Sequence, residues 1–112
     1  MILAISTHTK SAQQVGKLAK LYENGQVSET TARALTKVVD FEISQLRADL
    51  DATQQDLLAF ENRYNLSTEE FFRQWQAGQT DDSMDYVEWA SLAQMAENLR
   101  KRLEFLSSEN LA

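Results

Sequence analysis

Residues 64–95 read YNLSTEEFFRQWQAGQTDDSMDYVEWASLAQM, and they hold the clearest signals for local structure in the chain. Ser67 followed three residues later by Glu70 is a capping box, in which each side chain accepts a hydrogen bond from the other residue's backbone amide. Leu66 before the cap and Phe71 at the fourth helical position form the matching hydrophobic staple. We therefore expect a short helix to begin directly after Ser67.

The same stretch predicts where this short helix ends and the next helix begins. Gly78 suits the left-handed conformation that commonly follows the last turn of a helix. Residues 79–83 are polar and are expected to form a loop, and either Asp82 or Ser83 can cap the helix that follows. Residues 64–83 thus form a short helix and an acidic loop between two longer segments.

The two longer segments carry apolar residues at alternating spacings of four and three, the heptad pattern of a coiled-coil seam. The series of the predicted helix 28–63 is Val39, Ile43, Leu46, Leu50, Thr53, Leu57 and Phe60, and it continues to Tyr64. The series of the predicted helix 84–107 is Trp89, Leu92, Ala96, Leu99, Leu103 and Leu106. We expect the two helices to fold back on each other as an antiparallel hairpin.

The first 27 residues give weaker signals. Residues 1–7, MILAIST, show no helical stripe, so we expect a frayed chain end, with a short strand on another sheet edge as the alternative. The spacing of the next apolar side chains predicts a small helix over residues 11–24, followed by Gly25. These side chains are Val15, Leu18, Leu21 and Tyr22. Ser28 is expected to cap the long helix.

Composition favours an all-α fold. The 112 residues include no proline and only three glycines, so strong helix breakers are nearly absent. This length favours a single helical domain over residues 1–112, divided into segments 1–27, 28–63, 64–83 and 84–107. The expected architecture is an antiparallel helical hairpin or coiled coil with a short intervening helix and a small N-terminal helix.

Several classes of protein are disfavoured by what the sequence lacks. There is no cysteine, and hence no disulfide, thiolate metal site or cysteine nucleophile. No apolar run approaches the roughly 20 residues that span a bilayer, and residues 1–5 are too few for the core of a signal peptide. We therefore expect a soluble cytoplasmic protein without a membrane association.

The net charge of −6 is unevenly distributed. Five basic and three acidic side chains give residues 1–40 a charge of +2, so the other 72 residues carry −8. Binding to duplex nucleic acid requires clustered lysine and arginine, and this pattern argues against it. A basic protein partner is the better match, while the alternative is that the acidic residues only maintain solubility.

The acidic residues near the short helix raise the question of a metal site. Asp85 and Glu88 lie three residues apart on one helical face, an arrangement suited to a hard divalent cation. Helical-bundle nucleotide pyrophosphatases, however, use paired E-x-x-E and E-x-x-D motifs, and only one D-x-x-E is present here. Acidic residues in first helical turns also stabilise the helix dipole. We therefore expect no metal, no cofactor and no enzymatic activity, with a metal-dependent hydrolase as a lesser alternative.

The aromatic residues divide into two groups. Phe71 and Trp89 lie on the apolar stripes and are expected in the core. Phe72 follows Phe71 directly and points about 100° away from it, so the two cannot both face one narrow seam. Phe72, Trp75 and Tyr86 are therefore candidates for exposed aromatic anchors with an acidic rim, the usual composition of a protein-binding hot spot.

Residues 64–92 also carry a family resemblance. They read as Y-x-M/L-S-x-E-E-F, then G, D-D/S-x-D and E-W-x-S-L. The matching residues are Tyr64, Leu66, Ser67, Glu69, Glu70, Phe71, Gly78, Asp82, Asp85, Glu88, Trp89, Ser91 and Leu92. This pattern resembles a group of small acidic helical bacterial proteins, frequent in cyanobacteria, that look like the smaller partner of two-protein toxin–antitoxin pairs. The resemblance implies an antitoxin role.

These observations lead to one functional hypothesis and one alternative. The hypothesis is a non-enzymatic, antitoxin-like module that binds and neutralises a basic protein partner, such as a toxin encoded next to it. The candidate partner-binding residues are Glu69, Glu70, Phe72, Trp75, Asp82, Asp85, Tyr86 and Glu88. The alternative is a structural coiled-coil homo-oligomer or adaptor, and a homodimer is expected in either case because narrow apolar stripes need a cover.

Overall fold

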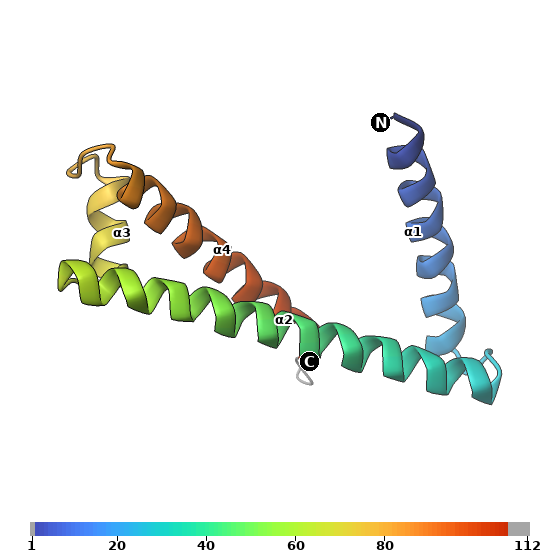
Figure 1. Ribbon diagram of the computed structural model, residues 1–112. Helices are drawn as coiled ribbons and strands as arrows, with labels where there is room; N and C mark the ends of the chain where they lie inside the picture. Colours follow the sequence, from blue (N-terminus) through green and yellow to red (C-terminus); the bar gives the residue numbers. More distant parts are fainter. Residues whose placement is uncertain (1, 108–112) are drawn as a thin grey trace. The chain divides into compact units, whose positions relative to one another are not determined.

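The structure, a computed structural model, describes the backbone of residues 2–107 and the side chains of residues 8–107 (Figure 1). Over this range the chain forms four helices and no strand. They are α1 (Ile2–Glu23), α2 (Glu29–Tyr64), α3 (Thr68–Gln76) and α4 (Met84–Ser107). The predicted all-α class is confirmed. None of these helices is long and apolar enough to cross a membrane.

Contacts within the chain divide it into two units, Met1–Val39 and Asp40–Ala112. The first unit contains α1 and the start of α2, and the second contains the rest of α2 with α3 and α4. The expectation of a single domain stays a prediction.

In the first unit, local sequence fixes the turn between α1 and α2. Gly25 has a φ of +70°, and the next amide, of Gln26, donates to the carbonyl of Leu21 over 2.8 Å. Many helices end with this hydrogen bond around a residue in the left-handed conformation. The hydroxyl of Ser28 accepts from the amide of Thr31 over 3.1 Å, so Ser28 caps α2 as predicted.

The start of α1 differs from the sequence prediction. Residues 2–7 continue the helix, so the prediction of a frayed end or a short strand is wrong over these residues, while residue 1 lies outside the described range. No proline or glycine separates residues 2–7 from the helical segment that follows. Each β-branched residue in a helix costs only a few tenths of a kcal/mol, so the helix can extend toward the N-terminus.

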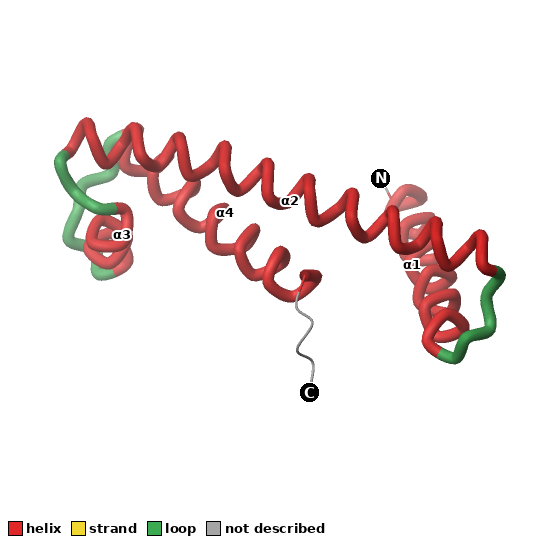
Figure 2. The backbone as a smooth tube through the Cα atoms, turned by 90° about the horizontal axis from the view of Figure 1, so that it is seen from below, coloured by secondary structure: helices red, strands yellow, loops and turns green. Residues whose placement is uncertain are grey.

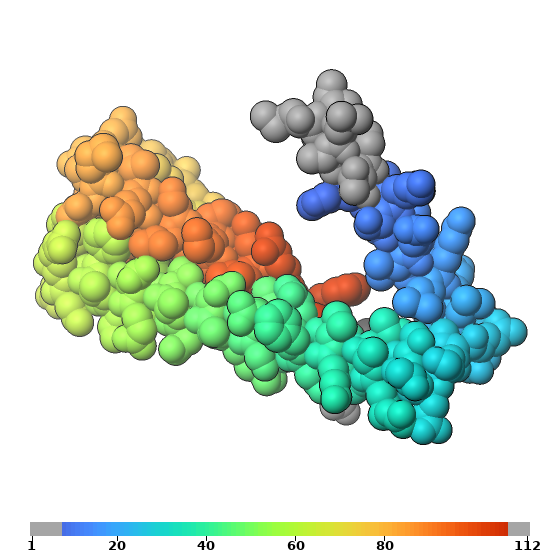
Figure 3. Space-filling view, turned by 45° about the vertical axis from the view of Figure 1, so that its right-hand side comes forward, coloured from blue at the N-terminus to red at the C-terminus, as the bar shows by residue number. Residues whose placement is uncertain are grey.

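In the second unit, α2 and α4 pack antiparallel, with α3 between them (Figures 1 and 2). Side chains of α4 pack directly against those of α2 on the face seen in the space-filling view (Figure 3). The heptad positions supply most of the core. Those buried are Leu46, Thr53, Leu57 and Phe60 on α2 and Trp89, Ala96 and Leu99 on α4.

Trp89 lies at the centre of this core and is completely buried. Its ring stacks on that of Phe71, with the centroids 4.0 Å apart and the planes 2° from parallel. The rings of Phe60 and Tyr64 stack on it from α2, at 5.6 and 5.7 Å. The indole N–H donates to the hydroxyl of Thr68 over 3.0 Å, which satisfies the one polar group of the side chain. All three helices of the unit thus meet at one residue.

Thr53 is the one buried polar residue among the described side chains. Its hydroxyl donates to the carbonyl of Asp49 over 2.8 Å and lies 3.7 Å from the sulfur of Met95 on α4. The polar group therefore occupies a core position of the heptad series without an unsatisfied hydrogen bond.

The predicted cap of α3 is half correct. The hydroxyl of Ser67 accepts from the amide of Glu70 over 3.1 Å, as expected. The carboxylate of Glu70, however, does not return to the amide of Ser67, because it binds Arg73 and Gln74 instead. Charge-assisted hydrogen bonds to a guanidinium are stronger than one bond to a neutral amide. At the other end, Gly78 has a φ of +71° and ends the helix as predicted.

The loop before α4 shows which of the two candidate caps is used. The hydroxyl of Ser83 accepts from the amide of Tyr86 over 3.3 Å. The carboxylate of Asp81 accepts from the amide of Ser83 over 2.9 Å and orders the loop just before the helix. Ser83, rather than Asp82, therefore caps α4.

Replacing Phe71 tests this description of the core. Phe71→Ala should lower the free energy of unfolding by about 3–5 kcal/mol, because it leaves a cavity beside Trp89. Phe105→Ala, at a position that is 80% exposed on α4, should change it by less than about 0.5 kcal/mol. Urea unfolding followed by tryptophan fluorescence measures both values in the second unit, which contains both tryptophans. Equal losses in the two variants would contradict the packing described here.

Candidate functional site

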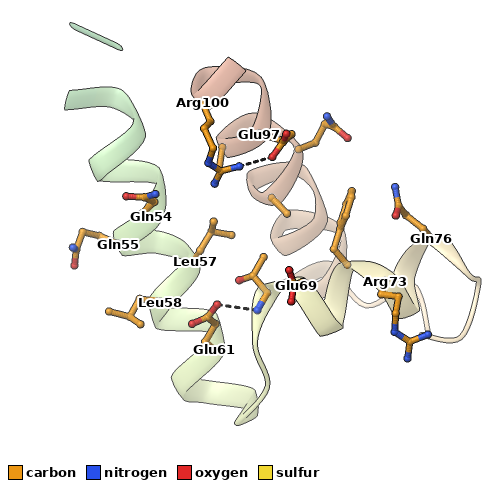
Figure 4. A pocket seen from close by; sticks show the side chains of 15 residues that line it. Gln54, Gln55, Leu57, Leu58, Glu61, Glu69, Arg73, Gln76, Glu97 and Arg100 are labelled. Carbon is orange, nitrogen blue, oxygen red and sulfur yellow. Dashed lines mark hydrogen bonds and ion pairs between the residues drawn. The ribbon is translucent and has the colours of Figure 1, made fainter. Parts of the chain in front are cut away.

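A groove with a volume of about 760 Å³ lies among α2, α3 and α4 of the second unit (Figure 4). Its apolar lining comes from Leu57 and Leu58 on α2, Phe72 on α3, and Ala93 and Ala96 on α4. Leu57 points from α2 toward α4, and the two alanines opposite leave space that larger residues would fill. The groove is therefore an apolar hollow between helices.

Charged and amide side chains surround the apolar lining. They are Gln54, Gln55, Glu61, Glu69, Arg73, Gln76, Gln94, Glu97 and Arg100. On the α4 side Arg100 forms an ion pair with Glu97, and on the α3 side Arg73 pairs with Glu70 over 2.5 Å. Both cations of the rim are thus neutralised within the chain.

Two rim carboxylates have no cationic partner among the described residues. Glu61 accepts a hydrogen bond from the amide of Thr68 over 2.8 Å, which ties the end of α2 to the start of α3 but leaves its charge unbalanced. Glu69 is exposed and makes no hydrogen bond or ion pair within residues 8–107. Negative charge therefore remains at the end of the groove where α2 meets α3.

A second polar network lies beside the aromatic core and joins α2 to α4. The carboxylate of Asp85 accepts from the hydroxyl of Tyr64 over 2.5 Å and from the guanidinium of Arg63 over 2.8 Å. These two hydrogen bonds lower the pKa of Asp85 below its ordinary value, and the same carboxylate raises the pKa of Tyr64. Asp85 thus holds the N-terminal end of α4 on the C-terminal end of α2.

Glu70 is held in the same way on α3. Its carboxylate accepts two hydrogen bonds from Arg73 and one from Gln74. The bonds from Arg73, followed by that from Gln74, lower the pKa of Glu70 from 4.5 to about 2. Glu70 therefore stays ionised far below neutral pH and serves the internal structure of α3.

The structure brings only two of the eight predicted partner-binding residues into the groove, Glu69 and Phe72. Glu70 and Asp85 carry intrachain ion pairs, as described above. Trp75 and Tyr86 are half-buried with their rings beside that of Phe71, at 6.1 and 5.3 Å. Asp82 and Glu88 are exposed outside the groove. Whether any of the eight contacts a partner stays a prediction.

Sequence reasoning missed most of the groove lining. Leu58 carried one usable signal, since it is a large apolar residue outside the heptad series of α2, and it is 48% exposed. Ala93 and Ala96 carried none, because an alanine leaves a hollow only when the neighbouring helices stand far enough apart. That separation depends on the aromatic rings between α2 and α4.

Within residues 2–107, no group of three or more histidine, aspartate or glutamate side chains is placed to hold a metal ion. Asp85, the residue on which the hydrolase alternative depended, is bound to Arg63 and Tyr64.

No protein-family model, curated protein or solved structure matches the chain. The resemblance to antitoxin-like proteins therefore stays a hypothesis, and what the site does has to be argued from its own geometry.

The hydrogen bonds of Glu70 predict its titration. Because its pKa is lower in the folded state, this carboxylate stabilises the fold fully above pH 4.5, and the contribution is lost as the pH falls from 4.5 toward 2. Carboxyl NMR should show a midpoint near 2, and Arg73→Met should move that midpoint toward 4.5. Lys101→Met, which removes an exposed cation on α4, should leave it unchanged. A wild-type midpoint near 4.5 would show that the ion pair does not form in solution.

Proposed function

We propose that the protein is a non-enzymatic, cytoplasmic, antitoxin-like module that binds a basic protein partner through the surface around α3. The observation that supports this most directly is the apolar groove with uncompensated carboxylates at its end. Binding sites of this kind combine a desolvated apolar centre with a charged rim that orients the partner.

The charge of the second unit supports a basic partner. Residues 40–112 contain six basic and fifteen acidic side chains, a charge of −9. A field of this sign speeds association with cations and disfavours acidic partners. Packing of the long helices against each other does not require this negative charge, since their seams are apolar.

The structure suggests separate roles for the predicted residues. Phe72 is the aromatic anchor that faces the groove, and Glu69 is the acidic residue beside it. Asp82 and Glu88 extend the negative surface beyond the groove. The remaining four, Glu70, Trp75, Asp85 and Tyr86, maintain the shape of α3 and of the start of α4 in this proposal.

Co-expression with the product of the adjacent gene tests the proposal. We expect a stoichiometric complex that weakens at least tenfold between 0.1 and 0.5 M salt, because exposed charges are screened over a shorter distance. Glu69→Lys combined with Glu88→Lys should weaken it by a similar factor, while Glu104→Lys, an exposed acid on α4 outside the groove, should not. Failure of the two proteins to associate at any salt concentration would refute the proposal.

A second candidate function, a structural homo-oligomer, is favoured by another face of α2. Val38 and Phe41 are 62% and 65% exposed and lie one turn apart. They belong to a second series with alternating spacings of four and three, in which every residue is uncharged and exposed. The series is Ala34, Val38, Phe41, Gln45, Ala48 and Ala52. Such a stripe is the seam expected of a helix that pairs with a second copy of itself.

Phe41→Asp tests this second candidate. If two copies pair along the outer face of α2, the substitution should raise the dimer dissociation constant at least tenfold, because it buries an unpaired charge in the seam. Phe105→Asp is the matched control on α4, at a position 80% exposed. Sedimentation velocity over a range of concentrations measures both. A wild-type chain that stays monomeric at both ends of a 100-fold range of concentration would refute this second candidate function.

A further inference from the structure

We infer that the groove receives one helix of the partner, laid along α2 and α4, with an apolar stripe facing inward and lysine or arginine toward the α3 end. This inference rests on the function proposed above and specifies how that function is carried out. It depends on the spacing of the groove edges, on the position of the exposed apolar side chains and on the distribution of charge.

The two long edges of the groove have the spacing of helix-to-helix contacts. Along α2 the lining includes Gln54, Leu58 and Glu61, and along α4 it includes Ala93, Glu97 and Arg100. Both sets follow the pattern i, i+4, i+7, the residues that one helix presents to a neighbour. Each edge spans about 10 Å, or two helical turns. A third helix can therefore lie between the edges, as in other complexes where an amphipathic helix fills an apolar groove.

The exposed apolar side chain at the edge favours a helix over a compact small molecule. A volume of about 760 Å³ also falls in the range of small-ligand sites. Leu58, however, lies at the edge of the groove on α2 and is 48% exposed (Figure 4). A helix that extends past the hollow covers this side chain, whereas a molecule confined to the hollow leaves it in water.

The charges of the groove favour a basic helix and determine which end of the groove its basic residues occupy. Arg73 and Arg100 are paired with Glu70 and Glu97, so these pairs carry no net charge. Glu61 and Glu69 have no cationic partner among the described residues, and both line the end of the groove beside α3. Basic side chains of the incoming helix are therefore favoured at this end of the groove.

Two synthetic peptides of 18 residues test the inference on the full-length chain. Both carry leucine at heptad spacing; one carries lysine at the flanking positions and the other glutamate. Fluorescence anisotropy of the labelled peptides should show binding of the lysine peptide and at least tenfold weaker binding of the glutamate peptide. Equal affinity for the two peptides would overturn the inference.

Variants that fill the groove provide the structural control. Ala93→Trp should weaken binding of the lysine peptide at least tenfold, and Ala59→Trp, on α2 outside the groove, should leave it unchanged. If Ala93→Trp lowers stability, Gln54→Trp replaces it, at an exposed position on the opposite edge. It should also weaken binding of the lysine peptide. Identical binding by all three variants would overturn the inference.

The same variants separate this inference from the function on which it rests. A complex with the adjacent gene product that survives Ala93→Trp and Gln54→Trp undiminished would refute the helix in the groove and leave partner binding intact. Absence of that complex with the wild-type chain would refute the proposed function itself. Self-association of the chain that both groove-filling variants abolish would show instead that the groove holds a helix of a second copy.

Discussion

The burial of one indole ring determines the geometry of the second unit. Trp89 projects from α4, stacks on Phe71 of α3 and contacts Phe60 and Tyr64 of α2. A ring of this size keeps the first turns of α4 away from α2, and α3 occupies the space between them (Figure 1). Farther along, the small side chain of Ala96 faces α2 from a buried position. The groove is the space left where large rings give way to alanines.

The acidic character of residues 61–88 has two distinct physical origins. Carboxylates that accept hydrogen bonds from arginine, tyrosine or backbone amides fix the ends of helices, and Glu61, Glu70 and Asp85 are of this kind. Carboxylates without such partners among the described side chains, such as Glu69, remain free to act on other molecules. Each exposed ion pair adds little stability by itself, so the first group contributes mainly by orienting side chains.

The elements that depend on local sequence could be predicted, and those that depend on distance between helices could not. Ser67, Gly25 and Gly78 act within one turn of the chain, and their roles follow from residue type. The heptad series likewise placed Leu57 in the core. The partner of Glu70 depends on which of several nearby donors forms the strongest hydrogen bonds to it. The groove depends on how far Trp89 separates α2 from α4. A pattern of residue types contains neither quantity.

The contacts around α3 join residues closer in sequence than contacts farther along α2 and α4, such as that of Thr53 with Met95. Glu61 binds the amide of Thr68 seven residues away, and Trp89 binds the hydroxyl of Thr68 at a separation of 21. Chains rich in such near neighbours fold quickly, since little loop entropy is lost before the first contacts form. The surface beside α3 can thus assemble early during folding, before any more remote pairing of the chain is needed.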